Sequence, residues 1–254
     1  MMNAREQIWG VEPTRRPKGQ RRGKRKPVAG EQQSLAHVRT WGGPRRNAGC
    51  KAGARPQVRH RARAVLKHTH PVHVTLRRAK GLPSFRSERL RRLLERAIRD
   101  TRREGFRIIQ YSLQADHVHL VVEAAGATVL SNGMRSFAVR IAMRVNRRIL
   151  GRTRGRVWGD RYHRRDLTSP SEVRSTLVYV LANHMKHGET DVGLLDPCSS
   201  GPWFEGWIHV LDPPPEPSPV QRAETWLLNV GWIERGGGYL HLGEVPSAVR
   251  ARSR

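Results

Sequence analysis

The sequence predicts an α+β fold of the ferredoxin-like class, the split βαβ arrangement, with a four-stranded antiparallel sheet and helices on one face. Two observations within residues 67–188 support this prediction. Segments in which apolar residues alternate and segments in which they recur every three or four positions follow one another in the order β-α-β-β-α-β. Only a tight turn separates the second and third strands. The second face of such a sheet is left open for a ligand.

The first strand and the first helix are predicted from residues 70–77 and from the segment after Ser87. Residues 70–77, His-Pro-Val-His-Val-Thr-Leu-Arg, alternate as a strand does. Ser87 directly before Glu88 is typical of a helix N-cap, so we expect a helix to begin there. One face of this helix is apolar and consists of Leu90, Leu93, Leu94, Ala97 and Ile98.

A hairpin, a second helix and a fourth strand complete the predicted sheet. Residues 106–113 are its second strand, and the third strand follows a turn near residues 114–116. Residues 156–167 are predicted as the fourth strand, with Gly159 inside it. The second helix has an apolar face made of Leu130, Met134, Phe137, Ala138, Ile141, Ala142, Val145 and Ile149.

A third helix is predicted between Ser169 and Gly188. Ser169 is placed as the N-cap, Pro170 as the first helical residue and Glu172 three residues after the cap, a pattern typical of a helix start. Gly188 is placed as the glycine that ends the helix. These signals predict one continuous helix.

Composition divides the chain into three regions. Residues 1–66 hold 17 Lys and Arg against 3 Asp and Glu and lack apolar periodicity, so we expect a basic, largely disordered arm. Residues 67–188 hold 26 against 9 and form the predicted domain. Residues 189–254 hold 5 against 9 and are rich in Trp and Pro. This last region is either a small accessory module or an extension that packs on the core.

The charge of the chain indicates the class of its partner. A formal net charge of +27 favours polyanions through counterion release, so nucleic acid is the leading expectation. A membrane partner is not expected, because no stretch approaches the roughly 20 apolar residues of a spanning helix. Cys50 and Cys198 show no Cys-x-x-Cys spacing, so neither a zinc ribbon nor a disulfide framework is implied. The expected compartment is the reducing cytoplasm.

Two histidines in the third predicted strand are candidate metal ligands. Side chains alternate along a strand, so His117 and His119 point to one face while Val118 and Leu120 point to the other. Neutral imidazole is the commonest side-chain metal ligand, and two imidazoles about 7 Å apart along a strand can share one ion. This pair alone amounts to half of a metal site.

A tyrosine and an asparagine in the third predicted helix are candidate partners of these histidines. Tyr179 and Asn183 are four residues apart and would share one face of a helix. A phenol oxygen can attack phosphorus, and an amide oxygen is a hard ligand suited to Mg²⁺ or Mn²⁺. Taken alone, Tyr179 among Leu177, Val178, Val180 and Leu181 would be a core residue, and Tyr162 and Tyr111 are alternative tyrosines. The residues alone do not separate these alternatives.

Three motifs in this order resemble those of the REP-associated tyrosine transposases, which belong to the HUH single-tyrosine transposases of simple bacterial insertion sequences. They are Asp-His-Val-His-Leu at 116–120, Val-Trp-Gly-Asp-Arg-Tyr at 157–162, and Tyr-Val-Leu-Ala-Asn at 179–183 followed by Lys-His-Gly at 186–188. The resemblance covers roughly residues 68–190. Members of this family commonly have Asn-Pro where this chain has Asn183-His184, so the end of the third helix is expected to differ.

The resemblance implies a role for each of these residues. His117 and His119 would be the metal ligands, Tyr179 the nucleophile and Asn183 the third ligand, carried by the nucleophile's helix. His184 and His187 become possible additional ligands or DNA contacts. Candidate contacts to the DNA backbone are Arg140, Arg144, Arg161, Arg164, Arg165 and Lys186, with Trp158 either a base-stacking platform or a core residue.

The function implied is that of a metal-dependent single-stranded DNA endonuclease and strand transferase, a transposase that uses Mg²⁺ or Mn²⁺ and no nucleotide cofactor. Tyr179 would form a 5′-phosphotyrosine on hairpin-bearing DNA, in a monomer or a homodimer. One alternative is a non-catalytic, basic nucleic-acid-binding module of ferredoxin-like fold, although its strands lack the aromatic signature of an RNA recognition motif. Another is a metal phosphoesterase that uses His117, His119 and water.

Overall fold

The computed structural model describes residues 65–186, 195–209, 211–212, 214 and 216–246. The predicted N-terminal arm, residues 1–66, lies almost entirely outside this part of the chain, as do His187 and the predicted helix end at Gly188. The boundaries predicted for the three regions therefore stay predictions.

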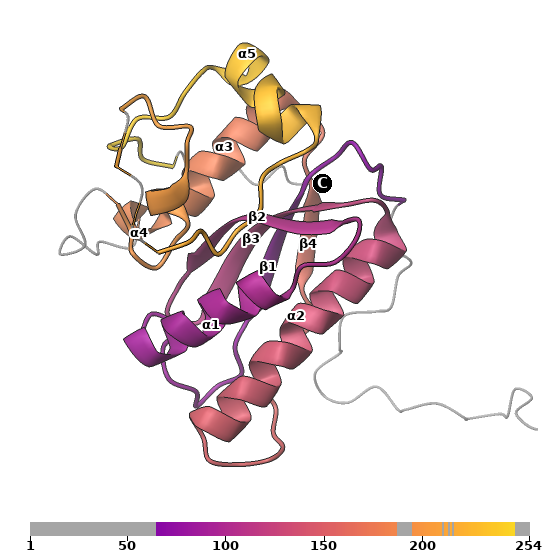
Figure 1. The fold of residues 1–254 in the computed structure, drawn as a ribbon, viewed down its shortest axis with the longest axis vertical. Helices are drawn as coiled ribbons and strands as arrows, with labels where there is room; N and C mark the ends of the chain where they lie inside the picture. Colours follow the sequence, from indigo (N-terminus) through magenta and orange to yellow (C-terminus); the bar gives the residue numbers. More distant parts are fainter. Residues whose placement is uncertain (1–64, 187–194, 210, 213, 215, 247–254) are drawn as a thin grey trace, which may run out of the picture. The chain divides into compact units, whose positions relative to one another are not determined.

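The observed elements follow the predicted order and form a four-stranded antiparallel sheet (Figure 1). The strands lie in the order β2-β3-β1-β4, which is that of the ferredoxin-like fold. The predicted fold class is confirmed. In chain order the elements of this part are β1 (Val72–Arg77), α1 (Glu88–Asp100), β2 (Phe106–Leu113), β3 (His117–Ala124), α2 (Ala127–Arg148), β4 (His163–Asp166), α3 (Pro170–Leu181) and α4 (Asn183–Lys186).

The two faces of the sheet carry two separate apolar clusters. Helices α1 and α2 cover one face, where Val118, Leu120 and Val122 of β3 are buried with their apolar residues. Helix α3 packs on the other face, where Val121 joins its cluster, so the expectation that this face is left open is wrong. Because side chains alternate along β3, His117 and His119 point to the face that carries α3. The alternation thus places the two histidines on the same side of the sheet as Tyr179.

Strand β2 changes face at a bulge. The pairing of β2 with β3 shifts register between Ile108 and Gln110. Residues before the shift, such as Ile108, and after it, such as Tyr111, both face the α1–α2 cluster, while Ile109 joins the α3 cluster. An extra residue in one strand reverses the alternation, so even-numbered residues before the bulge and odd-numbered residues after it face the α1–α2 layer.

The fourth strand is shorter than predicted. Only residues 163–166 pair with β1, whereas the prediction was residues 156–167. Around Gly159 the chain instead pairs with the segment just after β1: the Gly159 N–H donates to the Arg77 carbonyl at 2.8 Å, and Trp158 forms a single bridge with Arg78. A Cβ at position 159 would lie 3.0 Å from the Arg78 carbonyl oxygen, so this close backbone approach favours glycine.

The third helix begins as predicted but ends early. The Ser169 side chain accepts a hydrogen bond from the Glu172 N–H, and Pro170 occupies the first turn. The helix α3 ends at Leu181, because Ala182 leaves helical geometry with φ −107° and ψ 18°. The prediction of one continuous helix is therefore wrong, and Asn183 begins the separate short helix α4.

The C-terminal segment packs on the core, which is one of the two arrangements that its sequence left open. After a 3-10 turn (η3, Gly201–Trp203), a π-helical turn (η4, Leu227–Gly231) leads into α5 (Trp232–Gly236). Leu227, Leu228 and Trp232 are buried in the same cluster as α3. Arg174 of α3 also pairs with Glu244 at 2.6 Å. This segment thus holds α3 from the side that faces away from the sheet.

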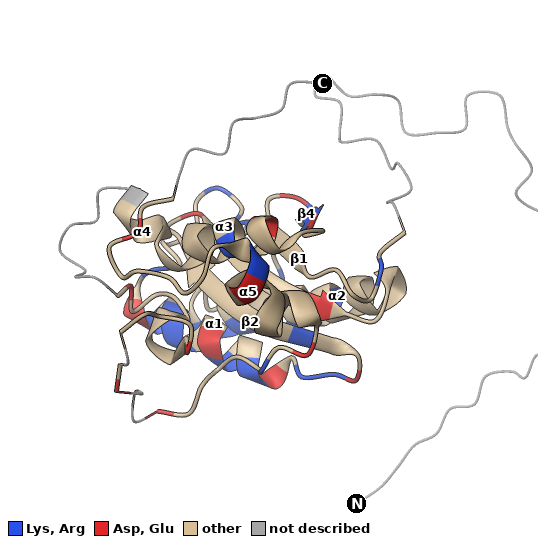
Figure 2. Cartoon of the chain, turned by 90° about the horizontal axis from the view of Figure 1, so that it is seen from above, with Lys and Arg blue, Asp and Glu red and all other residues tan. Residues whose placement is uncertain are grey.

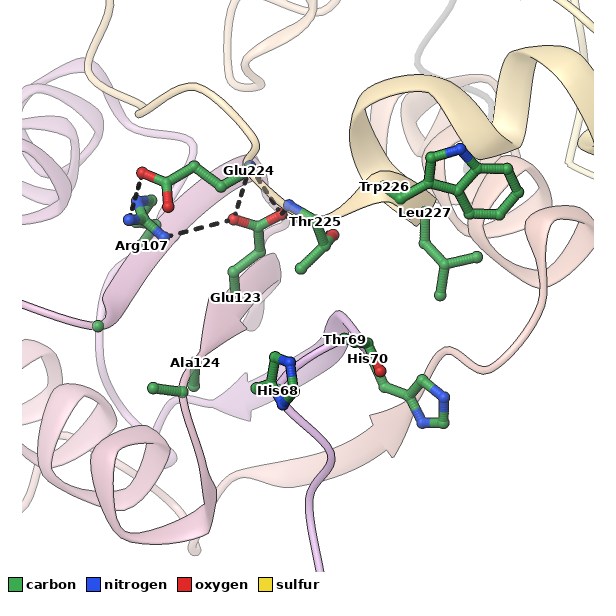
Figure 3. A pocket seen from close by; sticks show the side chains of 12 residues that line it. His68, Thr69, His70, Arg107, Glu123, Ala124, Glu224, Thr225, Trp226 and Leu227 are labelled. Atoms are coloured by element: carbon green, nitrogen blue, oxygen red, sulfur yellow. Dashed lines mark hydrogen bonds and ion pairs between the residues drawn. The ribbon is translucent and has the colours of Figure 1, made fainter.

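Hydrogen bonds to Glu123 of β3 connect the C-terminal segment to the sheet (Figure 3). Its carboxylate is 2% exposed and accepts hydrogen bonds from the Glu224 N–H at 3.0 Å, from the Thr225 N–H at 2.8 Å and from the Thr225 hydroxyl at 2.8 Å. Arg107 lies 3.7 Å from the same carboxylate and also pairs with Glu224. A cavity of about 720 Å³ opens beside this cluster.

Replacing Glu123 with alanine is expected to lower the free energy of unfolding by about 3 kcal/mol, because several buried donors lose one shared acceptor. Urea unfolding followed by circular dichroism measures the change. Glu104→Ala is the matched control, since Glu104 is exposed, and it should alter stability by less than about 0.5 kcal/mol. Equal unfolding midpoints for the two variants would contradict the role assigned to Glu123.

No helix within the described residues is both long enough and apolar enough to cross a bilayer.

Candidate active site

The side chains of His117 and His119 converge. Their Nε2 atoms are 2.8 Å apart, and the ring centroids are separated by 4.5 Å with the planes nearly perpendicular. The His119 side chain is buried, while that of His117 is partly exposed. Strand β3 therefore brings two imidazole nitrogens to one point on the α3 face of the sheet.

The opposite ring nitrogens of both histidines are held by neighbouring side chains. The Nδ1 atom of His117 lies 2.6 Å from Oδ1 of Asp116, and this hydrogen bond lowers the pKa of the Asp116 carboxyl. The Nδ1 atom of His119 lies 3.1 Å from Nε2 of His73 and 3.2 Å from the Thr75 hydroxyl. Partners of this kind fix the tautomer and ring orientation of metal-binding histidines.

His73 is a neutral partner of His119. Burial, together with the nearby charges of Arg165, His163 and His117, lowers the pKa of His73 to about 4. At neutral pH its imidazole carries one proton, so it can donate one hydrogen bond and accept another. It therefore adds no charge to the buried side of the site.

Tyr179 reaches the same point from α3. Its hydroxyl is 3.5 Å from Nε2 of His119, and its ring meets the rings of His119 and His73 edge-on, with centroids 5.0 Å and 5.8 Å away. Burial raises the pKa of the Tyr179 phenol, and the charge of Arg77 opposes this effect. Because the tyrosine and the histidines belong to one chain, no second copy is needed to bring them together.

The other two tyrosines considered lie elsewhere. Tyr111 is fully buried against α1, where its hydroxyl donates to Glu95 at 3.1 Å. Tyr162 packs against the apolar cluster on the α1–α2 face of the sheet, the face opposite to His119. Of these three tyrosines, Tyr179 is the one whose hydroxyl lies beside the paired imidazoles.

Asn183 carries a buried amide without a hydrogen-bond partner. The residue is completely buried, and neither its Oδ1 nor its Nδ2 has a partner in the described part of the chain. Such an atom costs about 1–3 kcal/mol. Within the described residues no three His, Cys, Asp or Glu side chains are grouped as a metal site. An amide oxygen such as that of Asn183 is a ligand type that Mg²⁺ accepts.

The predicted DNA-contacting residues fall on different sides of the sheet. Arg165 lies directly across from His73, so it shares the face of the histidines, and its side chain is exposed. Arg164 points to the opposite face, and both its Nε and its Nη2 donate to the carboxylate of Asp166. Arg161 is exposed in the loop before β4. Lys186 ends α4, and its side chain lies outside the described part.

The remaining candidates lie on or under α2. The Trp158 indole N–H donates to the Ala138 carbonyl at 2.9 Å, and its ring packs against Phe85 and Phe137, so this side chain anchors the core. Arg140 is exposed on α2, and Arg144 pairs with Asp100 of α1. His184 is buried at the start of α4, away from solvent.

Asp116, His73, Thr75 and Arg77 are site residues that the sequence did not single out. Asp116 directly precedes His117 in the quoted motif, so an adjacent carboxylate was a usable signal. His73 and Thr75 alternate in the predicted first strand, but their place beside His119 depends on the register between β1 and β3. That register is a tertiary property, which no local pattern encodes.

The chain is similar to a known protein family and to solved structures. Residues 64–182 match the family described as "Transposase IS200 like". A solved structure described as "Structure of the REP associates tyrosine transposase bound to a REP hairpin" is similar with a TM-score of 0.46 and 16% sequence identity, over 56% of this chain and 82% of that one. Among curated proteins the comparison gives no match.

Proposed function

We propose, from the premise that residues 64–182 form a domain of the IS200-like transposase family, that the chain cuts and rejoins single-stranded DNA through a covalent tyrosine link. The observation that carries this proposal is the convergence of the Tyr179 hydroxyl with Nε2 of His119 and Nε2 of His117. A nucleophile and two metal-ligating atoms at one point suit phosphoryl transfer. The motifs that resemble REP-associated tyrosine transposases imply hairpin-bearing DNA as the substrate.

In the proposed first step, the Tyr179 oxygen attacks the phosphorus of a phosphodiester. The bond from phosphorus to the 3′-oxygen breaks, the phenol proton is lost to solvent, and the departing oxygen takes up a proton to become a 3′-hydroxyl. The strand on the 3′ side of the cut then remains attached to Tyr179 as a 5′-phosphotyrosine. One phosphoester bond is exchanged for another, so no nucleotide cofactor is consumed.

In the second step a 3′-hydroxyl, from the same or another strand, attacks the phosphotyrosine. The bond between phosphorus and the Tyr179 oxygen breaks, and the phenol regains its proton. The ring of half-buried Tyr179 packs edge-on against the rings of His73 and His119, and this packing orients the phenol oxygen for its attack on phosphorus. Arg77 and Arg165, on the same face of the sheet, supply positive charge for the phosphates on either side of the cut.

The donor atoms of these residues are of types that suit a divalent cation. Nε2 of His117, Nε2 of His119 and the buried, unpartnered amide oxygen of Asn183 would hold it, and Asp116, His73 and Thr75 would orient the two imidazoles. Mg²⁺ or Mn²⁺, when bound, supplies Lewis-acid polarisation of the phosphate and stabilises the developing charge. The raised pKa of Tyr179 makes that help necessary, because the phenol is protonated at neutral pH.

Hairpin DNA labelled at its 5′ end or its 3′ end tests the proposal. The full chain is incubated with each DNA and Mn²⁺, and the products are separated on a denaturing gel. We expect a protein–DNA species that carries only the 3′-end label, that is absent with EDTA, and whose modified peptide contains Tyr179. Cut DNA without any covalent species would instead support the phosphoesterase, and binding without cutting would support the non-catalytic module.

A further inference from the structure

His163 of β4 is a histidine on the α3 face of the sheet that the proposed chemistry does not use. Strand β4 is an edge strand and pairs with β1 (Figure 1). His163 lies directly across from Thr75, and Thr75 lies directly across from His119. Residues that oppose one another in antiparallel pairs point to the same side of a sheet, so these three side chains form one row. Two strand spacings, roughly 10 Å, separate His163 from His119 along the row.

The part of this face that belongs to β4 is exposed. Helix α3 packs over β2 and β3. The side chains of His163 and Arg165 are exposed, whereas Arg164 and Asp166, which point to the other face, are partly exposed. Figure 2 shows the basic residues of β4 in blue. A DNA strand that reaches Tyr179 can therefore lie along β4, beside α3.

The His163 ring is available to a substrate. It forms no hydrogen bond or ion pair with any side chain in the described part of the chain. By contrast, both ring nitrogens of His117 and of His119 are engaged. Burial is the largest cause of the lowered pKa of His73, and the charge of His163 contributes to it. His163 thus lies close to the buried side of the site while its own ring is exposed.

The direction of attack places the departing oxygen on the side of His163. In phosphoryl transfer the attacking and departing oxygens lie roughly in line, on opposite sides of phosphorus. Tyr179 attacks from α3, which packs over β2 and β3. The departing 3′-oxygen therefore points away from α3, toward β1 and β4.

His163 is the group on this part of the face that is best suited to exchange a proton. The other side chains that β1 and β4 present to this face are His73, Thr75, Arg77 and Arg165. An arginine stays protonated in proteins, and a threonine hydroxyl does not ionise near neutral pH. His73 is held by its hydrogen bond to His119. Imidazole, by contrast, gains and loses a proton near neutral pH.

We propose that His163 is a catalytic residue, which gives a proton to the departing 3′-oxygen in the first step and takes one from the attacking 3′-hydroxyl in the second. This inference rests on the proposed function in taking Tyr179 as the nucleophile. In the first step the imidazolium of His163 loses its proton as the bond from phosphorus to the 3′-oxygen breaks. In the second step the neutral imidazole takes a proton as the 3′-oxygen bonds to phosphorus, and solvent protonates the departing phenolate. His163 ends each cycle in its starting form.

Sulfur at the scissile bond separates proton donation from binding. The cut position is mapped with the parent chain, and hairpin DNA is then made with sulfur in place of the bridging 3′-oxygen at that position. A thiolate is a far weaker base than an alkoxide, so it departs without taking up a proton. The rate of adduct formation is measured with both DNAs, labelled at the 3′ end, in Mn²⁺. The proteins are the full-length parent, His163→Gln, His163→Arg and the control His209→Gln, which changes an exposed histidine of the C-terminal segment.

We expect His163→Gln to form the adduct about 100-fold or more slowly than the parent with the oxygen DNA, because a general acid is lost. With the sulfur DNA the two rates should agree within about threefold, because no proton is needed. His163→Arg keeps a positive charge but does not give up a proton, so it should behave as His163→Gln does with both DNAs. His209→Gln should match the parent with both.

Hairpin affinity in EDTA and the thermal midpoint should equal those of the parent in every variant, so that a slow reaction reflects neither weak binding nor unfolding. An unchanged rate of His163→Gln with the oxygen DNA, or equal losses with the two DNAs, would overturn the proton-transfer role. A parent-like rate of His163→Arg with the oxygen DNA would also overturn it, because positive charge alone would then be sufficient. Absence of any adduct with the parent chain would instead overturn the proposed function, and this inference with it.

Discussion

Replacing Tyr179 with phenylalanine is expected to lower covalent attachment to hairpin DNA by about a thousandfold or more, which takes it below detection. The substitution removes only the hydroxyl, the atom that lies 3.5 Å from Nε2 of His119. The ring that packs edge-on against His119 and His73 is kept, so the surrounding histidines keep their positions. A denaturing gel with 3′-labelled hairpin DNA and Mn²⁺ measures the adduct.

Tyr162→Phe is the control for this variant. Tyr162 belongs to the cluster on the opposite face of the sheet, so the adduct should form at the parent rate when its hydroxyl is removed. Hairpin affinity in EDTA should be unchanged in Tyr179→Phe, because the lost hydroxyl contributes to the reaction and not to holding the stem. If Tyr179→Phe still forms the adduct and Tyr162→Phe does not, the nucleophile has been assigned wrongly.

The fold could be predicted because each of its main elements has a local signal. The alternation of residues 70–77 and the apolar face that begins at Leu90 each require only a few neighbouring residues, and both elements were found where expected. The fourth strand was predicted too long because no local pattern marks where its pairing with β1 begins. The path of residues 156–162 is set by the close approach of Gly159 to the Arg77 and Arg78 backbone. That contact joins distant parts of the chain.

The end of the third helix could not be predicted from local sequence either. A glycine at position 188 predicted where the helix would stop, but the backbone leaves helical geometry at Ala182, a residue with high helix propensity. No local pattern predicts a break there. The consequence for the site is specific: Asn183 follows the break, so its amide is not positioned by simple four-residue spacing from Tyr179.

The sequence predicts which residue types form the candidate site, but it does not predict how all of them are arranged in space. His117 and His119 share a face by alternation alone, which any strand guarantees. The hydrogen bonds that join His119 to His73 and Thr75 depend on the pairing of β1 with β3, in which Thr75 lies across from His119. Arg164 and Arg165 are adjacent and equally basic, and only the pairing of β4 with β1 reveals that Arg165 shares the face of the histidines. The roles of all these residues in DNA cleavage stay predictions.

Alanine at His119 is expected to lower the affinity for Mn²⁺ by more than about 100-fold, and to abolish the metal-dependent adduct with it. The reason is that one of two converging imidazoles is removed from the point where their Nε2 atoms meet. Isothermal titration calorimetry with Mn²⁺ alone measures the affinity without reference to DNA or activity. Loss of an outer hydrogen-bond partner of a ligand costs less, about 10- to 100-fold, so Asp116→Asn should fall between the parent and His119→Ala.

The order of these affinities distinguishes a metal site from two histidines that merely hydrogen-bond to each other. A site in which Nε2 of His117 and Nε2 of His119 bind one cation predicts the graded series of parent, Asp116→Asn and His119→Ala, because the outer carboxylate acts only through His117. Asp160→Asn is the matched control: Asp160 is exposed and its carboxylate accepts from the Arg161 backbone N–H, so this variant should bind Mn²⁺ as the parent does. Identical Mn²⁺ binding by all four proteins would mean that the cation does not bind at these histidines. Tyr179 would then need another source of positive charge. Arg77 could supply it, because its charge already lowers the pKa of Tyr179 against the effect of burial.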